Sequence, residues 1–514
     1  MSQRLSRLSD ESVVDRIWSK DPSVWGGSGD TVELADRLGW LDAVDRASDS
    51  SVQLAEFALD VRSSFDSVVL CGMGGSSLAA EVFCRVVRHR GGYPVVSVLD
   101  STAPAAVRAA ADRSKNSLFL ISSKSGTTLE TTSFLAHFWE LTGADASRFV
   151  AITDPGTPLH ELATQRGFRR IIEGTVDVGG RFSALSPFGL VPAALAGVDI
   201  GVLVDGTRRA MESCRRPASE ENHGAWLGVV MGEAAAAGRD KLTLSLPAPL
   251  ASFGLWLEQL VAESTGKSGR GVLPVLDDGS SRLDSYGGDR LFVSLSVASD
   301  VDGASAERLD ALAQRGHPTV QLTIPSVEDI GGEMFRWEFA TAVAGAVLGV
   351  NPFDQPNVSE SKANTSRVLE QGGATDDLPD VSPVQFESFS AGVRPGDYVA
   401  ILAYVAPTAA LDHTLETIAR GIQDRVRVPV TVGYGPRYLH STGQFHKGGP
   451  ATGHYIQIVD LPGPDLPVPD AEFSFGDLAR AQADADAQAL RSRGRPLVRL
   501  PSMAALEALV ETLD

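Results

Sequence analysis

The sequence predicts an α/β protein with a helical N-terminal arm and two domains, each built on a doubly wound, mostly parallel sheet. Its 514 residues exceed one average domain. Short β-branched runs alternate with helical patterns along the chain, an order typical of parallel sheets covered by helices. Apolar residues make up 43% of the chain and charged residues 21%, as in a globular protein with a large core. We expect the arm at 1–44, the first domain at 45–240 and the second at 241–514.

Four β-branched runs predict the strands of the first domain. They cover residues 67–72, 93–100, 117–123 and 148–154. After the first run, "SLAAEVFCRVVRH" places its apolar residues on one helical face, which predicts a covering helix. The first 44 residues are expected to be helical from "VVDRIWSKD" and "VELADRLGWLDAV".

A second series of runs predicts the strands of the second domain. They cover residues 241–247, 291–297, 319–325, 398–405, 428–435 and 455–461. After a proline-rich loop, "FGDLARAQADADAQALRSRG" has the pattern of an amphipathic helix.

Charge and composition exclude several classes of protein. The net charge of −20 and the pI near 4.9 argue against nucleic acid or an anionic membrane as partner. Three cysteines without metal-ligand spacing fit a reducing compartment without a disulfide framework. The start lacks the apolar region of a signal peptide, and the apolar stretch 339–350 is too short to span a bilayer. We expect a cytoplasmic protein.

The stretch "LVAESTGKSGRG", residues 260–271, contains the Gly-Lys-Ser of a nucleotide-binding P-loop. A P-loop also needs a glycine five residues before Gly266, because several backbone N–H groups must surround the phosphates. Val261 occupies that position, so a nucleotide site is disfavoured. The residue of interest in this stretch is then Glu263, an acidic residue at the end of an apolar run and ahead of a Gly/Lys/Arg loop.

Two loops of the first domain have the character of phosphate sites. "CGMGGSS" (71–77) follows a strand and opens a helix, whose N-terminus favours an anion. A dinucleotide site, with Asp100 as ribose partner, is the rival interpretation, but its third glycine is replaced by Ser77. A plain glycine-rich turn is the ordinary alternative.

"SSKSGTT" (122–128) places several hydroxyl groups and one ammonium group at the start of another helix. Ser and Thr at helix starts are usually only caps. Two such loops at the carboxyl ends of parallel strands define one crevice, the place where open α/β sheets bind ligands. The two loops together predict a small phosphorylated ligand.

Arg181 and Glu263 are candidate catalytic residues. Arg181 follows two glycines and precedes a helix start, where it could stabilise an oxyanion. An ordinary surface ion pair is the alternative for Arg181, and a solvent-facing position is the alternative for Glu263. A carboxylate such as Glu263 can act as the base in C–H proton abstraction.

Three further candidates lie in the second domain. Lys362 follows a proline-containing loop, and "YLHSTGQFHKGGP" (438–450) holds His440 and His446. No acidic or cysteine partner stands at metal-ligand spacing from these histidines, so a zinc site is disfavoured. Proton transfer is the better functional interpretation, with packing or capping as the alternative for His446.

Taken together, these motifs resemble the glucose-6-phosphate isomerase family, and most of all the isomerase half of fused transaldolase/glucose-6-phosphate isomerase proteins. The resemblance runs over almost the whole chain, through "DRIWSKD", "LVAESTGKSGRG", "NPFDQPNVSESK", "HSTGQFHKGGP" and "FGDLARAQADADAQAL". It implies two α/β domains of the sugar-isomerase type and, as in many members, a homodimer.

The resemblance also implies roles for individual residues. The residues that it places around the substrate are Gly75, Ser76, Ser123, Lys124, Ser125, Thr128 and Gly180. Many members have Thr-Phe where this chain has Ser125-Gly126, so a hydroxyl is kept.

The resemblance assigns four catalytic residues: Glu263 as the base, Arg181 at the sugar end, and Lys362 and His440 at ring opening, with His446 as the alternative histidine. Here the lysine precedes the histidine in the chain, whereas the order is reversed in the animal and common bacterial members.

The implied reaction interconverts glucose 6-phosphate and fructose 6-phosphate through a cis-enediol(ate), without metal or cofactor. Three alternatives stay open: an enzyme that also accepts mannose 6-phosphate, a non-catalytic sugar-phosphate sensor of the same fold, and a nucleotide-dependent enzyme built on "CGMGGSS".

Overall fold

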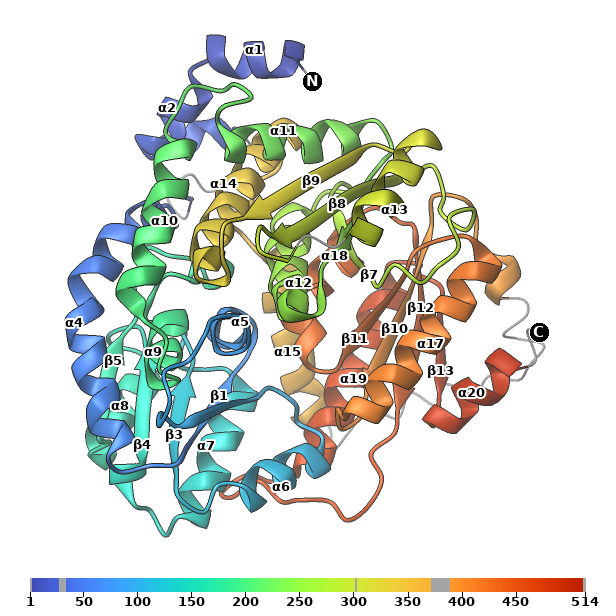
Figure 1. Ribbon diagram of the computed structural model, residues 1–514. Helices are drawn as coiled ribbons and strands as arrows, with labels where there is room; N and C mark the ends of the chain where they lie inside the picture. The colour runs from blue at the N-terminus through green and yellow to red at the C-terminus, as the bar shows by residue number, and fades with distance from the viewer. Residues whose placement is uncertain (1, 27–33, 301–302, 371–388, 512–514) are drawn as a thin grey trace.

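The computed structural model describes residues 2–26, 34–300, 303–370 and 389–511. Three parallel sheets and their helices form the molecule, with the sheet of the first half at the lower left of Figure 1 and the other two above and to the right of it. The parallel α/β class predicted from the sequence is thereby confirmed.

The first sheet has the strand order β2-β1-β3-β4-β5, and all its neighbouring strands run parallel. Its strands are β1 (Ser67–Gly72), β2 (Val95–Leu99), β3 (Ser117–Ser122), β4 (Phe149–Thr153) and β5 (Arg170–Glu173). Its helices are α5 (Leu78–Val86), α6 (Pro104–Asp112), α7 (Leu129–Leu141) and α8 (Pro158–Arg166). The chain leaves β1 toward β2 on one side and continues with β3 on the other, so the loops after β1 and β3 flank a topological switch point.

The second half contains two sheets of four parallel strands. In the order β7-β6-β8-β9, the first consists of β6 (Lys241–Ser245), β7 (Leu273–Asp277), β8 (Arg290–Val297) and β9 (Thr319–Ile324). In the order β11-β10-β12-β13, the second consists of β10 (Tyr398–Tyr404), β11 (Val430–Tyr434), β12 (Gly453–Val459) and β13 (Leu497–Leu500).

All the predicted strands are present, but β5, β7 and β13 were not predicted, nor was the division of the second half between two sheets. β5 has only four residues, β7 contains Pro274 and β13 follows Pro496, features that weaken a strand pattern. The domain boundaries at 44/45 and 240/241 stay predictions.

The N-terminal arm is helical in short pieces. These are α1 (Ser2–Asp10), α2 (Val13–Trp18), η1 (Pro22–Trp25) and η2 (Gly39–Asp42), and the long helix α4 (Ala43–Arg62) follows. Part of the predicted helix at 32–44 lies outside the described residues. Figure 1 shows α1 and α2 at the top of the molecule, beside α11.

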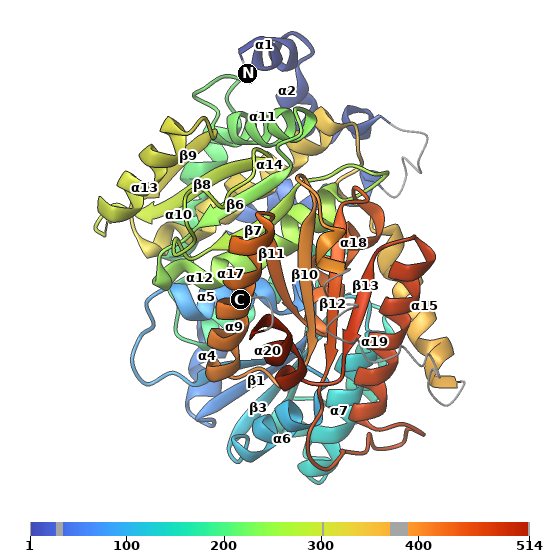
Figure 2. The ribbon, with the colours of Figure 1, turned by 90° about the vertical axis from the view of Figure 1, so that its right-hand side faces the viewer.

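The remaining helices cover the sheets or run between them. They are α9 (Pro187–Leu195), α10 (Ile200–Cys214), α11 (His223–Ala236), α12 (Ala251–Leu257), α13 (Gly303–Gln314), α14 (Ile330–Leu348), α15 (Pro356–Glu370), α17 (Ala409–Val426), α18 (Gly443–Gly448), α19 (Phe475–Ser492) and α20 (Met503–Glu511). The predicted amphipathic helix is α19, and Figure 2 shows it alongside β12 and β13. No helix in these ranges is long and apolar enough to cross a membrane.

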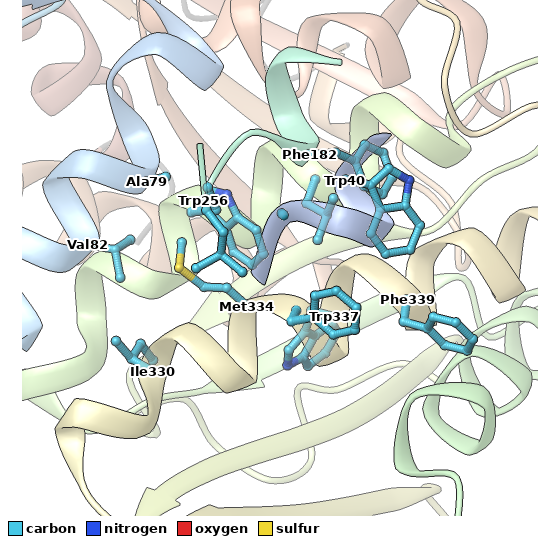
Figure 3. Packing of buried hydrophobic residues seen from close by; sticks show 14 of the residues in the cluster. Trp40, Ala79, Val82, Phe182, Trp256, Ile330, Met334, Trp337 and Phe339 are labelled. Carbon is cyan, nitrogen blue, oxygen red and sulfur yellow. The ribbon is translucent and has the colours of Figure 1, made fainter. Parts of the chain in front are cut away.

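The largest hydrophobic core joins helices from distant parts of the chain. Helix α14 is buried along most of its length, and its Met334 and Trp337 belong to the same cluster as Trp256 of α12 and Val82 of α5. Figure 3 shows these side chains together with Trp40 and Phe182. Burial of this apolar surface connects the arm, the first sheet and the second half into one molecule.

Candidate active site

The loops after β1 and β3 lie side by side at the switch point. The Ser122 hydroxyl donates to the Ser76 carbonyl oxygen at 2.9 Å. Thr128 occupies the N-cap position of α7 and Ser77 that of α5, yet neither side chain caps its helix. The Thr128 hydroxyl instead accepts from Ser123 at 3.1 Å. These hydroxyl groups are therefore not explained as ordinary helix caps.

The Lys124 ammonium group bonds residues outside the two loops. Its ammonium group pairs with the Asp154 carboxylate and donates to the Thr175 carbonyl oxygen at 3.0 Å. Burial lowers the pKa of Lys124, while Asp154 acts in the opposite direction. A contact between Lys124 and a phosphate would require the ammonium group to leave Asp154.

Glycine allows the first loop to approach three other parts of the site. A Cβ atom at Gly75 would lie 2.1 Å from the Gly180 carbonyl oxygen, so the "GMGGSS" and "GGRFS" backbones are in direct contact. At Gly74, where φ is +54°, a Cβ atom would meet the Gln259 side chain and the His440 carbonyl oxygen. Side chains at these positions would separate the loop from the rest of the site.

Glu263 and Arg181 form a buried ion pair at this meeting point. Arg181 Nη1 donates to Glu263 Oε1 at 3.2 Å, and the two residues are each only 3% exposed. Glu263 ends η7 (Glu258–Glu263), a π-helical segment that continues α12, and such segments are frequent at functional sites. Gln259 Nε2 donates to Glu263 Oε2 at 3.1 Å and also to the His440 carbonyl oxygen at 2.8 Å.

All five N–H groups of Arg181 have acceptors. Besides Glu263, Nη1 reaches Gln355 Oε1 at 3.3 Å, and Nε donates to the Ser264 hydroxyl at 2.7 Å. Nη2 donates to the carbonyl oxygens of Pro352 at 2.5 Å and Asp354 at 2.8 Å. Burial lowers the pKa of Arg181, whereas Glu263 and Asp354 favour its charged form. The guanidinium plane is thus fixed between the carboxylate and residues 352–355.

An aromatic cluster lies behind this arginine. The Phe182 ring is 4.9 Å from that of Phe353 and 5.3 Å from that of Trp40, centroid to centroid. Trp25 contacts Phe353 edge-on at 4.9 Å. The N-terminal arm therefore supports both the Arg181 turn and residues 352–355 through apolar packing.

His440 is joined to the first domain through Glu130. Its Nε2 lies 2.8 Å from Glu130 Oε1, and Gln482 of α19 donates to the same oxygen at 2.7 Å. Because a carboxylate oxygen accepts from both neighbours, Nε2 of His440 is the donor to Glu130. Thr102 donates to Gln482 Oε1 at 3.0 Å and completes the chain of hydrogen bonds.

Arg437, in η9 (Arg437–His440), anchors this histidine turn. Its guanidinium group bonds Asp100 at 2.6 Å and Glu81 at 3.3 Å. Burial alone would lower the pKa of Arg437, but the two carboxylates raise it. Asp100, the ribose partner in the dinucleotide alternative, is therefore committed to an ion pair.

His446 is packed in the core of the second half. Its Nδ1 lies 2.9 Å from the Tyr398 hydroxyl, and its ring is within 6 Å of the rings of Tyr398 and Tyr455, centroid to centroid. Burial lowers the pKa of His446 to about 3. Of the two histidines in the motif, it is His440 whose backbone carbonyl oxygen binds Gln259 and whose imidazole bonds Glu130 of α7.

Lys362 lies in α15, and its side chain is outside what the structure describes. The predicted role of Lys362 remains a prediction. Within the described ranges, no three His, Cys, Asp or Glu side chains gather as ligands for a metal ion. A cavity of about 240 Å³ lies between α4, β5 and α9, where Phe182 lines it; no predicted site residue does.

Sequence reasoning missed several polar partners of the site. Gln259 lies four residues before Glu263, so helical spacing could have identified it. Gln355 could have been taken from the same motif as Lys362. Glu130 is 310 residues from His440, and no local pattern indicates that contact.

Glycine- and hydroxyl-rich loops at the switch point of a parallel sheet lie beside a buried glutamate–arginine pair, in an α/β fold that matches neighbours of the sugar-isomerase type. The family model of phosphoglucose isomerase matches residues 46–275 of the chain.

Curated relatives and solved structures are also similar to this chain. Glucose-6-phosphate isomerase of Staphylococcus saprophyticus is 28% identical over an alignment of 395 residues, and the match covers 66% of this chain and 89% of the relative. A hypothetical protein of Thermus thermophilus is 26% identical, with a TM-score of 0.62 over 72% of this chain and 97% of that structure. Glucose-6-phosphate isomerase of Chlamydia trachomatis shares the fold at 18% identity, with a TM-score of 0.59 over 73% of this chain and 87% of that structure.

Proposed function

We propose that this protein interconverts glucose 6-phosphate and fructose 6-phosphate, with Glu263 as the base that carries a proton between C2 and C1. The observation that carries the proposal is the buried contact between Glu263 and Arg181, at 3.2 Å, beside the two loops of the first domain. The names of the relatives support the same substrate pair.

The two loops are proposed to bind the phosphate group. The backbone of the Gly75–Ser76 turn and the hydroxyl groups of Ser123, Ser125 and Thr128 lie at the starts of α5 and α7, where helix N-termini favour anions. Phosphate binding remote from the reacting carbons would hold C1 and C2 against Glu263.

Arg181 can stabilise the negative charge both before and after the proton transfer. Before the transfer, the negative charge is on Glu263; afterwards Glu263 is neutral, and the charge lies on the enediolate oxygen. A guanidinium group fixed beside the base can pair with whichever group carries the charge. Its longest hydrogen bonds, at 3.2 Å to Glu263 and 3.3 Å to Gln355, are the ones most readily exchanged for a substrate oxygen.

Ring opening requires a second acid–base group, for which His440 is proposed. With Nε2 bonded to Glu130, Nδ1 can exchange a proton with the ring oxygen. Lys362 is the proposed partner at the anomeric hydroxyl. Gln259 Oε1 is buried and without a hydrogen-bond partner among the described residues, so it can accept from a sugar hydroxyl group.

The decisive experiment compares the wild-type protein with Glu263→Gln. Conversion of fructose 6-phosphate, with EDTA present, is followed by NADPH formation through coupled glucose-6-phosphate dehydrogenase. The variant keeps the size of the side chain but loses the base, so we expect kcat to fall by about 10³-fold or more. Sugar-phosphate binding, measured by calorimetry, should survive.

Glu258→Gln is the matched control, because Glu258 lies in the same π-helical segment. This control should keep its turnover within a few-fold of the wild type. Equal turnover in Glu263→Gln and wild type would refute the role of the base. Binding without turnover in the wild type would favour the non-catalytic sensor.

A further inference from the structure

The Gly266-Lys267-Ser268 stretch, which has the letters of a P-loop, closes a tight turn in the structure. Lys267 and Arg270 face each other in a β-bridge, and Ser268 and Gly269 adopt positive φ angles of 53° and 73°. Lys267 Nζ donates to the Asn351 carbonyl oxygen at 2.5 Å, and Arg270 donates to that of Leu348 at 2.6 Å. Both cations thus bind carbonyl groups at and just beyond the C-terminus of α14, where helix carbonyls lack partners.

Lys267 and Arg181 both bond the same segment, residues 351–354. Lys267 forms an ion pair with Asp354, at 2.6 Å between Nζ and Oδ1, while Arg181 bonds the carbonyl oxygens of Pro352 and Asp354. Residues 351–354 therefore lie between two buried cations. They link a lysine outside the predicted site to the arginine beside Glu263.

Electrostatics makes this arrangement sensitive to Lys267. Its side chain is 7% exposed, and burial together with Arg181 lowers its pKa to about 7, while Asp354 and Glu263 counteract the shift. Two nearby cations repel each other, so the carbonyl groups and the Asp354 carboxylate are needed to hold both in place. Among the described residues, Lys267 and Arg181 are the two cations that bond residues 351–354, so removal of Lys267 would leave Arg181 alone in that role.

We propose that Lys267 is a positioning residue of the active site: by fixing residues 351–354, it holds the Arg181 guanidinium group against Glu263. Lys267 acts through Arg181 and does not touch substrate. The kinetic consequence rests on the proposed isomerase function. The same turn also fixes the start of α15, since Gln444 donates to the Gly266 carbonyl oxygen at 3.0 Å and accepts from the Asn357 amide at 3.0 Å.

The kinetic test compares Lys267→Met and Lys267→Arg with the wild type. Methionine keeps much of the volume but removes the charge and the donors, and it leaves the buried Oδ1 of Asp354 without its cation. We expect kcat to fall by about 10- to 100-fold in Lys267→Met, with KM for fructose 6-phosphate within about 3-fold, because misplacement of Arg181 affects the transition state. Lys267→Arg should recover much of the loss.

Lys241→Met is the matched control. Lys241 is also buried and donates to the Asp240 carboxylate at 2.6 Å and the Gly396 carbonyl oxygen at 3.0 Å, so it has the same kind of partners outside the site. Both methionine variants should lower Tm, but only Lys267→Met should lower the kcat of the folded protein. Equal kcat values in the two variants would overturn the proposal.

A second measurement does not depend on turnover. Hydrogen exchange followed by mass spectrometry should show faster exchange at residues 349–357 in Lys267→Met than in the wild type or in Lys241→Met. Unchanged exchange there would also overturn the proposal. If the wild type lacks isomerase activity but exchange responds as expected, the proposed function fails while the structural role of Lys267 stands.

Discussion

The two halves of the chain contribute to the site in different ways. In the first half, the groups proposed to bind phosphate come from two stretches, 71–77 and 122–128, each directly after a strand. In the second half, Glu263, residues 352–355 and His440 come from separate segments that meet through Arg181 and Gln259. Anion binding needs only local backbone geometry and a helix N-terminus, whereas proton transfer needs side chains from distant segments at hydrogen-bonding distance.

The largest effect beyond loss of the base is expected for Arg181→Lys. Lysine keeps the positive charge but has three donors in place of five, so it cannot hold Glu263, Ser264 and the carbonyls of 352 and 354 together. We expect kcat to fall by about 10²- to 10³-fold, with KM changed by only a few-fold. Steady-state kinetics measures both constants.

Arg46→Lys is the control for this substitution, because Arg46 forms a more exposed ion pair with Asp177 outside the site. Its turnover should equal that of the wild type. A fall in kcat of less than tenfold in Arg181→Lys would show that a positive charge at this position is enough for turnover. The distinction between local anion binding and proton transfer by side chains from distant segments would then be weaker.

In the loops proposed to bind phosphate, a smaller effect on the kinetic constants is expected from Ser125→Ala. Loss of one hydroxyl donor to the phosphate removes roughly 0.5–1.5 kcal/mol of binding free energy, about a 2- to 12-fold rise in KM for fructose 6-phosphate. The kcat value should stay near that of the wild type. Thr132→Ala removes a hydroxyl in the first turn of α7 that bonds the Leu129 carbonyl oxygen, and it should leave both constants unchanged. A fall in kcat without a change in KM would contradict the division between binding and chemistry.

The smallest effect on turnover is expected for His446→Phe, which tests the distinction between the two histidines of the second half. The folded pKa of His446, about 3, lies below its ordinary value of 6.5 because the ring is buried. Below pH 6.5, the unfolded chain binds a proton at His446 that the folded protein does not bind. The free energy of unfolding therefore decreases as the pH is lowered. Between pH 7 and 5, the wild type should lose about 2 kcal/mol of unfolding free energy through this group, and the variant should not.

Chemical denaturation at the two pH values measures this difference. The kcat value of folded His446→Phe should match that of the wild type. A large loss of turnover would make His446, and not His440, the histidine of the site.

Particular elements show how far sequence reasoning reaches. Strands β1 and β10 are short runs of buried apolar residues, and the local pattern predicted both within a residue or two. Glu263 and Arg181 were selected from motifs, and the structure brings them into contact. The pairing of Lys124 with Asp154 was not predicted, because the same loop composition fits an ammonium group that faces a phosphate.

By itself, the sequence determined most of the strands, the two hydroxyl- and glycine-rich loops and the chemical groups available for catalysis, because these depend on residues within a turn or two of each other. Only the tertiary structure decided that the second half holds two sheets, that the His440 imidazole bonds Glu130 while His446 is packed in the core, and that residues 351–354 join Lys267 to Arg181. These features depend on contacts between segments far apart in the chain. Their free energy arises from burial and hydrogen bonding that no local pattern of residues contains.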